Sequence, residues 1–304
     1  MAETIAITGA TGFVGHHLVN RLTGQPVNVR ALSRRGTIAG TVTVDGDLGN
    51  EAALRRLVDG AEHVVHLAGV VKSPRQEAFT EVNTVGTERL ARAMASGPGH
   101  LTLVSSLAAR HPEVSAYAAS KRAAEETALA ILGSERVTII RPPAIYGPGD
   151  RATLVIFKQL KSGLLMAPGP RGARFSLLFV GDLADLITAH LAGALDLPQQ
   201  IEPDDGRPGG YGWGDLAAIA SRALERRVRL IRIPVRLLRS PAQLADMLAR
   251  RFALDLPLAV DKLGELAHPN WVSGGPALSK PTSNITFETG FSSTLEWYRQ
   301  AGWL

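Results

Sequence analysis

Tyr117 and Lys121 are residues whose types and spacing suggest catalysis. A helix is predicted from Tyr117 to about Leu132, and on a helix residues i and i+4 lie on the same face. A lysine cation beside the phenol would lower the pKa of the tyrosine from about 10. Tyr117 could then exchange a proton with a hydroxyl or carbonyl group near neutral pH, as a general acid or base.

A glycine-rich stretch near the start of the chain is typical of a nucleotide site. A strand is predicted at residues 4–7, and directly after it come Thr8-Gly9-Ala10-Thr11-Gly12-Phe13-Val14-Gly15, which open into a run with helical spacing. At such a turn Gly9 permits the tight bend, Gly12 lets the backbone approach a pyrophosphate, and Gly15 lets the helix pack closely. The free N–H groups at the start of the helix favour phosphate.

The end of the second predicted strand indicates which dinucleotide binds. A carboxylate at this point binds the 2′-hydroxyl of NAD, whereas an arginine accommodates the 2′-phosphate of NADP. Here residues 27–32 are followed by Ser33, Arg34 and Arg35, without a carboxylate. We expect Arg34, with Arg35 and Ser33, to hold the phosphate through charge-assisted hydrogen bonds, and NADP to be preferred to NAD. The alternative is that both arginines are solvated loop residues.

The chain resembles the extended short-chain dehydrogenase/reductases, the epimerase/dehydratase-like group. The resemblance rests on the glycine spacing and on the position of Tyr117 and Lys121 between the fifth and sixth predicted strands, and it covers roughly residues 4–190. It implies that Tyr117 is the acid/base and that Lys121 tunes it and bonds the nicotinamide ribose. It also implies that Ser106, with Ser105 as a supporting neighbour, hydrogen-bonds the reacting oxygen, and that no metal is needed.

The same resemblance implies further contacts with the cofactor, which come in the family's order along the chain. They are Asp47 and Leu48 at the adenine, Ala68 and Gly69 beneath the cofactor, Asn83 as a brace for the site, and Pro142 and Ala144 near the nicotinamide.

Departures from the family's motifs reduce the number of reactions that we expect the protein to catalyse. Leu107-Ala108-Ala109 stand where sugar 4,6-dehydratases carry an acidic pair, and Ala144 stands where many nucleotide-sugar epimerases have asparagine. Residues 141–150 look most like the hydroxysteroid dehydrogenase and ketoreductase branch. We therefore expect an oxidoreductase that moves a hydride between a nicotinamide and a ketone or secondary alcohol. The alternatives are epimerisation through a transient ketone, a structural NADPH-binding subunit like the accessory subunit of respiratory complex I, and an NADPH-dependent redox sensor.

The elements that position these residues predict an α/β fold. Strands and helices alternate in the first half, which favours a doubly wound parallel sheet of the Rossmann type. After Pro142 the alternation loosens, and a smaller, partly interleaved C-terminal α/β portion is expected to bind substrate. The predicted division is 1–165 for the dinucleotide and 166–304 for the substrate, with roughly 174–195 returning to the core. Further helices are predicted at 79–95, 182–192, 213–224 and 294–301.

The amino-acid composition limits the cellular location and the binding partners that we expect. The 304 residues contain no cysteine, which excludes disulfides and thiolate sites, and neither a signal peptide nor a membrane-spanning run is evident, so a cytoplasmic protein is expected. The net charge of +5 is not concentrated in a block, so nucleic acid is not an expected partner. The partner is a small-molecule substrate, and a homodimer is a family expectation.

Two C-terminal segments, residues 236–239 and 244–252, mix arginine with leucine in an amphipathic manner. They either form solvated helix faces or contact an anionic membrane surface or a lipid-like substrate. An acylated ketone, as in bacterial ketoceramide reduction, is one such substrate.

Overall fold

The computed structural model describes residues 2–238, 240–242, 262–274 and 285–304. The chain forms two compact units, Met1–Arg141 with Leu183–Glu202, and Pro142–Asp182 with Pro203–Leu304. Arg239 and the predicted amphipathic segment 244–252 lie outside the described residues. The assignment of residues 166–304 to substrate binding stays a prediction.

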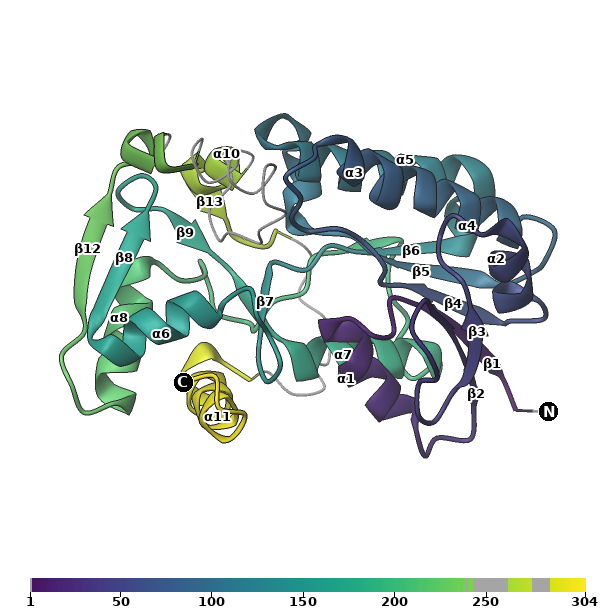
Figure 1. The fold of residues 1–304 in the computed structure, drawn as a ribbon, viewed down its shortest axis with the longest axis horizontal. Helices are drawn as coiled ribbons and strands as arrows, with labels where there is room; N and C mark the ends of the chain where they lie inside the picture. Colours follow the sequence, from purple (N-terminus) through teal and green to yellow (C-terminus); the bar gives the residue numbers. More distant parts are fainter. Residues whose placement is uncertain (1, 239, 243–261, 275–284) are drawn as a thin grey trace. The chain divides into compact units, whose positions relative to one another are not determined.

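A parallel sheet of seven strands forms the centre of the first unit, in the order β11-β6-β5-β4-β1-β2-β3. Helices α2, α4 and α5 cover one face, and α1 and α7 lie on the other (Figure 1). This arrangement confirms the predicted Rossmann-type fold. The strands are β1 (Thr4–Thr8), β2 (Asn28–Ser33), β3 (Val42–Asp45), β4 (His63–His66), β5 (His100–Val104), β6 (Val137–Ile140) and β11 (Gln200–Ile201). The helices are α1 (Phe13–Leu22), α2 (Glu51–Val58), α4 (Gly86–Met94), α5 (Ala116–Leu132), the short η4 (Ser134–Arg136) and α7 (Val180–Leu191).

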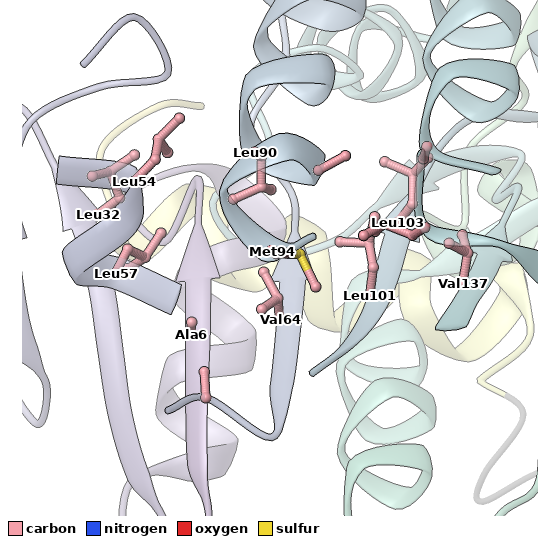
Figure 2. Packing of buried hydrophobic residues seen from close by; sticks show 14 of the residues in the cluster. Ala6, Leu32, Leu54, Leu57, Val64, Leu90, Met94, Leu101, Leu103 and Val137 are labelled. Atoms are coloured by element: carbon pink, nitrogen blue, oxygen red, sulfur yellow. The ribbon is translucent and has the colours of Figure 1, made fainter. Parts of the chain in front are cut away.

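A cluster of buried apolar side chains lies between the sheet of the first unit and one helical layer. Leu54 and Leu57 of α2 and Leu90 of α4 belong to this cluster with the strand residues Val64 and Leu101 (Figure 2). All five side chains are fully buried or nearly so. A parallel sheet that is covered on both faces requires strands with continuous apolar runs, which explains why the strand pattern was readable in the sequence.

Two predicted helices differ from the observed ones. The predicted helix 79–95 consists of α3 (Glu77–Phe79), a π-helical turn η1 (Thr80–Val85) and α4. The predicted helix 294–301 begins earlier, because α11 spans Phe287–Gln300. Gly290 weakens the helical signal in the sequence, but a β-carbon there would lie 2.9 Å from the ring of Tyr146. The glycine therefore allows the helix to pack on that ring.

The described residues of the second unit form three short parallel strand pairs and a core in which Phe157, Phe287 and Tyr298 pack together. The pairs are β7 (Ala144–Tyr146) with β10 (Leu177–Phe179), β8 (Leu164–Pro168) with β12 (Arg229–Ile233), and β9 (Arg174–Phe175) with β13 (Asn270–Trp271). The helices are α6 (Leu154–Ser162), α8 (Trp213–Ala223), η5 (Val235–Leu238), α10 (Lys262–Ala267) and α11.

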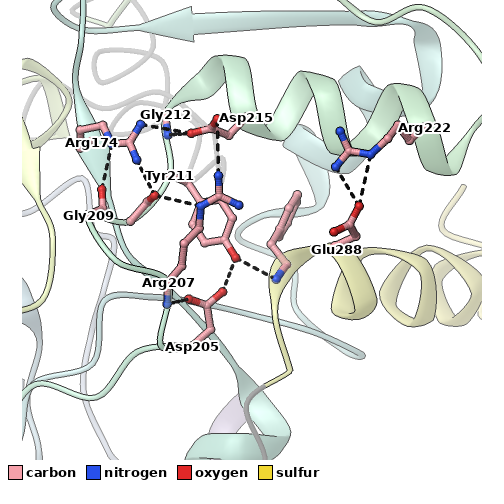
Figure 3. A network of polar contacts seen from close by, with 11 residues as sticks. Arg174, Asp205, Arg207, Gly209, Tyr211, Gly212, Asp215, Arg222 and Glu288 are labelled. Carbon is pink, nitrogen blue, oxygen red and sulfur yellow. Dashed lines mark hydrogen bonds and ion pairs between the residues drawn. The ribbon is translucent and has the colours of Figure 1, made fainter. Parts of the chain in front are cut away.

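Arginine and tyrosine side chains hold the irregular segment 203–212 in place (Figure 3). Arg174 donates to the carbonyls of Gly209 (2.8 Å) and Gly210 (2.7 Å). Tyr211 Oη donates to the Asp205 carboxylate and accepts from the Phe287 N–H at 3.1 Å. These bonds satisfy backbone groups that no strand or helix would pair.

Neither a membrane-crossing helix nor a metal cluster is found in the described part of the chain. None of its helices has both the length and the apolar character needed to cross a bilayer. No group of three histidine or carboxylate side chains in the same residues could hold a metal ion.

Candidate active site

The glycines in the turn between β1 and α1 let its backbone pack closely against neighbouring backbone. Gly9 has φ +75°, and a β-carbon there would lie 2.5 Å from the Ala68 nitrogen. A β-carbon on Gly15 would lie 2.7 Å from Ala10 Cα, so this glycine lets the first turn of α1 pack on the loop. Gly12 starts α1 without a side-chain cap, and the first turn carries no acidic residue. The N-terminal N–H groups of α1, next to the exposed Thr11 and the half-buried Phe13 and Val14, can therefore bind an anion.

The end of β2 carries positive charge. Ser33 is buried, and its Oγ accepts a hydrogen bond from the Arg35 N–H at 3.2 Å. Arg34 and Arg35 are exposed, and neither forms an ion pair with a described residue. The guanidinium groups thus remain available to a phosphate.

Asp47 and Leu48 lie after β3, and each has a local structural contact. The Asp47 carboxylate accepts from the Gly49 N–H at 2.8 Å, which closes a turn. Leu48 fills the space beside Gly86, where a β-carbon would lie 2.7 Å from its Cδ1. Contact of either residue with an adenine stays a prediction.

Asn83 braces the loop after β4 against α5. Its amide accepts from the Val70 N–H (2.7 Å) and donates to the Val70 carbonyl (3.0 Å) and to Ser120 Oγ (2.9 Å). The same loop contains Gly69, where a β-carbon would lie 3.0 Å from Asn83 Oδ1 and 3.7 Å from Lys121 Nζ. The structure therefore brings Gly69, Asn83 and Lys121 together. The π-helical turn at residues 80–85 carries Asn83 toward this loop.

His66, which sequence analysis did not select, continues this network. Its Nδ1 lies 2.5 Å from Thr8 Oγ1, and its Nε2 lies 2.9 Å from Thr87 Oγ1. Because Thr87 donates its hydrogen to the Asn83 carbonyl at 2.6 Å, Nε2–H must be the donor to Thr87, and Nδ1 accepts from Thr8. Burial, with the Lys121 charge as a smaller cause, lowers the pKa of His66 to about 3. The imidazole is therefore neutral and links the end of β1 to α4.

Tyr117 and Lys121 occupy one buried face of α5, one turn apart. The Tyr117 ring packs edge-on against Phe79, with 6.1 Å between ring centroids. Lys121 Nζ donates to the Val104 carbonyl, the last residue of β5, at 2.9 Å. Burial lowers the pKa of Lys121 to about 8, and the Glu125 carboxylate partly opposes that shift. A lysine cation with so little solvent around it acts strongly on neighbouring charge.

Ser106 follows β5 and caps a short helix, η2 (Leu107–Arg110). Its Oγ accepts from the Ala108 N–H at 3.2 Å, so its single hydrogen can be donated to another oxygen. Ser105 Oγ is buried and has no hydrogen-bond partner among the described residues. The short interval to α5 is filled by η2 and by η3 (Pro112–Val114).

A buried ion pair fixes the far half of α5. Arg141 donates to both carboxylate oxygens of Glu125, at 2.9 Å and 2.5 Å, and lies 3.8 Å from Glu202. Sequence analysis noted Arg141 only as part of a motif, because nothing in the spacing identifies Glu125 as its partner. Pro142 and Ala144 begin the second unit, and their contact with a cofactor stays a prediction.

The first unit fits a dinucleotide. The N-terminus of α1 has no side-chain cap and no acidic residue in its first turn, and a basic pair follows β2. The residues that would hold the cofactor lie at or just after the carboxyl ends of β1, β2, β3 and β4, the edge where doubly wound sheets bind ligands.

Comparisons with known proteins show the family to which the chain belongs. Residues 5–200 match the family model described as NAD dependent epimerase/dehydratase family. A ceramide reductase of Caulobacter vibrioides is 36% identical over 308 residues, which cover 99% of this chain and 96% of the relative. A UDP-glucose 4-epimerase of Vibrio cholerae is 31% identical over 218 residues, 62% of this chain and 66% of the relative.

Among solved structures, the complex of Thermus thermophilus UDP-glucose 4-epimerase with NAD matches with a TM-score of 0.72 and 20% sequence identity. The match covers 98% of this chain and 99% of that chain. This likeness shows the fold.

Proposed function

The chain belongs to the NAD-dependent epimerase/dehydratase family, and we propose that it is a reductase that uses NADPH to convert a lipid-like ketone into a secondary alcohol. The family resemblance predicted from the motifs is confirmed, and an enzyme of the epimerase/reductase superfamily follows from it. The observation that carries the finer proposal is the 36% identity, over 99% of the chain, to a relative named ceramide reductase. We therefore take a ketoceramide as the substrate class.

The chain's own residues supply acid catalysis and charge in this proposal. Bound NADPH supplies the hydride. Tyr117 Oη gives its proton to the ketone oxygen as negative charge develops there, and Ser106 Oγ donates a hydrogen bond to the same oxygen. Lys121 stabilises the tyrosinate that remains, since its cation lies one helical turn away on the same face. Asn83 and Ser120 hold the backbone of this turn, because Ser120 Oγ donates to the Tyr117 carbonyl at 2.8 Å.

The NADP preference is supported by the charge at the end of β2. Arg34 and Arg35 are exposed and unpaired with any described residue, and Ser33 supports the loop. A 2′-phosphate would take charge-assisted hydrogen bonds from these guanidinium groups.

Epimerisation is the second candidate, which the relative from Vibrio cholerae favours. An epimerase would use Tyr117, Lys121 and Ser106 in the same way but would retain its cofactor and show no net consumption of NADPH. Ala144, in place of the asparagine common in nucleotide-sugar epimerases, supports the reductase instead.

One kinetic experiment tests the proposal: NADPH and NADH oxidation with ketoceramide in detergent, by wild type, Tyr117→Phe and Arg34→Ala. We expect Tyr117→Phe to lower kcat by about 10²- to 10⁴-fold and to leave NADPH binding, followed by intrinsic fluorescence, unchanged. We expect Arg34→Ala to weaken NADPH binding by roughly ten- to a hundredfold and to leave NADH binding unchanged.

Arg55→Ala is the matched control, because Arg55 is an exposed arginine on α2 that lies outside the candidate site. Equal binding of both cofactors by wild type would contradict the role of Arg34. NADPH binding without turnover of the ketone, together with interconversion of UDP-sugars, would replace the reductase by the epimerase.

A further inference from the structure

The β8–β12 strand pair in the second unit has an exposed aliphatic face. Leu164 and Met166 of β8 are 37% and 43% exposed, whereas Leu165 between them is fully buried. In the parallel register Arg229 pairs with Leu164, and Ile231, 48% exposed, pairs with Met166. Paired residues of neighbouring strands lie on the same side of a sheet, so these four side chains share one face. The opposite face carries Leu165 into the core of this unit.

The strand that supplies half of this face is strongly basic. Residues 226–236 contain five arginines and no acidic residue. Arg229, Arg232 and Arg236 are exposed, and none of them forms an ion pair with a described residue. Through its contact with η5, α10 brings one carboxylate, Glu265, near this segment, and this carboxylate is paired with Lys262 at 3.0 Å. The positive charge here is therefore uncompensated within the described residues.

We propose that this arginine–aliphatic surface, formed by Leu164, Met166, Arg229 and Ile231 and extended by the exposed Arg236 of η5, docks the protein on an anionic lipid bilayer. The arginines match the negative surface potential of such a bilayer, at about 1 kcal/mol for each basic side chain near it, which is about a fivefold change in binding. The aliphatic side chains in register with them enter the boundary between headgroups and acyl chains. The next element, η5, also exposes an apolar side chain, because Leu237 is 62% exposed.

The combination of arginine and exposed aliphatic side chains favours a bilayer over a nucleic acid as the partner of this surface. A polyanion binds arginines through phosphate contacts and gains nothing from exposed aliphatic side chains between them, whereas an exposed apolar patch is typical of a membrane or protein contact. The proposal does not depend on the reaction that the protein catalyses. A lipid-like substrate would nevertheless be met at such a surface.

Vesicle co-sedimentation of the full chain tests the surface. The probes are large unilamellar vesicles of phosphatidylglycerol and phosphatidylcholine at about 30:70, with pure phosphatidylcholine as the neutral reference. We expect wild type to bind the anionic vesicles and not the neutral ones, and Arg229→Gln/Arg236→Gln to bind about thirtyfold more weakly. We expect Met166→Ser/Ile231→Ser, which changes exposed positions only, to bind roughly tenfold more weakly.

A control of equal charge is Arg55→Gln/Arg92→Gln, whose arginines are exposed in the first unit. The proposal is overturned if wild type does not bind the anionic vesicles, or if this control loses as much binding as the Arg229 and Arg236 variant. It is also overturned if the Met166 and Ile231 variant binds normally and a polyuridine oligonucleotide displaces the protein from the vesicles. Ketone reduction in detergent reports separately on the proposed function.

Discussion

At the scale of single residues, His66 shows how a buried titratable group ties folding to pH. Burial lowers its folded-state pKa to about 3, whereas a histidine in an unfolded chain titrates near about 6.5. Between these values the unfolded chain binds a proton that the folded protein does not. The contribution of His66 to the free energy of unfolding therefore rises with pH across this window. This contribution is lost progressively as pH falls from about 6.5 toward 3.

We predict a specific acid sensitivity from this group. At about pH 4.5, His66 should cost wild type roughly 3 kcal/mol of unfolding free energy relative to about pH 7. In His66→Gln most of that difference should disappear, because the glutamine does not titrate. Urea unfolding followed by circular dichroism at the two pH values measures it, with the exposed His16→Gln as control. An equal pH difference in wild type and His66→Gln would contradict the assignment.

At the scale of elements, α5 presents three ionisable side chains at a spacing of four: Tyr117, Lys121 and Glu125, all buried. Glu125 is held in place by the two hydrogen bonds from Arg141. Its carboxylate opposes the burial that lowers the pKa of Lys121. The buried pair thus anchors the helix and also keeps a negative charge near Lys121.

We predict that this charge sets the alkaline limit of activity. The rate of ketone reduction should fall as pH rises through about 8, because Lys121 loses its proton there. Glu125→Gln removes the opposing charge, so the pKa of Lys121 should drop further and the limit should move down by roughly one pH unit. The adjacent Glu126→Gln, which breaks only an exposed pair with Arg122, is the control. A pH–rate profile that moves equally in both variants, or in neither, would refute this role of Glu125.

The same elements show what the sequence could and could not predict. The β1–α1 turn, the helix with Tyr117 and Lys121, and the alternation of strands and helices along the chain were readable, because glycine geometry and apolar periodicity are local signals. The π-helical turn at residues 80–85 was not, since a π turn changes the apolar spacing by only one residue within a continuous helix. The Arg141–Glu125 pair and the His66 links join residues 16 to 58 positions apart, and only the fold brings such residues together.

At the scale of the whole molecule, the described residues of the two units contain separate clusters of buried hydrophobic side chains. One lies under the parallel sheet of the first unit, and the other contains the aromatic cluster of the second unit. Pro142 and Ala144 are the predicted cofactor residues that fall in the second unit, and neither belongs to its core. The arginine–aliphatic surface lies on the second unit alone. The proposed docking surface and all the predicted cofactor residues other than Pro142 and Ala144 therefore lie in different units.

We predict that NADPH stabilises the two units unequally. A ligand present at about a hundred times its Kd adds about 2.7 kcal/mol to the free energy of unfolding of the structure that binds it, so exchange through that unfolding slows about a hundredfold. Amide hydrogen exchange should slow by this factor in β1 and β4, which carry the glycine turn and Ala68. It should change much less in α8, whose buried residues Leu216 and Ile219 belong to the core of the second unit. Arg34→Ala, measured at the same NADPH concentration, should lose most of the slowing. Equal slowing in β1 and α8 would instead show that the two cores unfold as one cooperative structure.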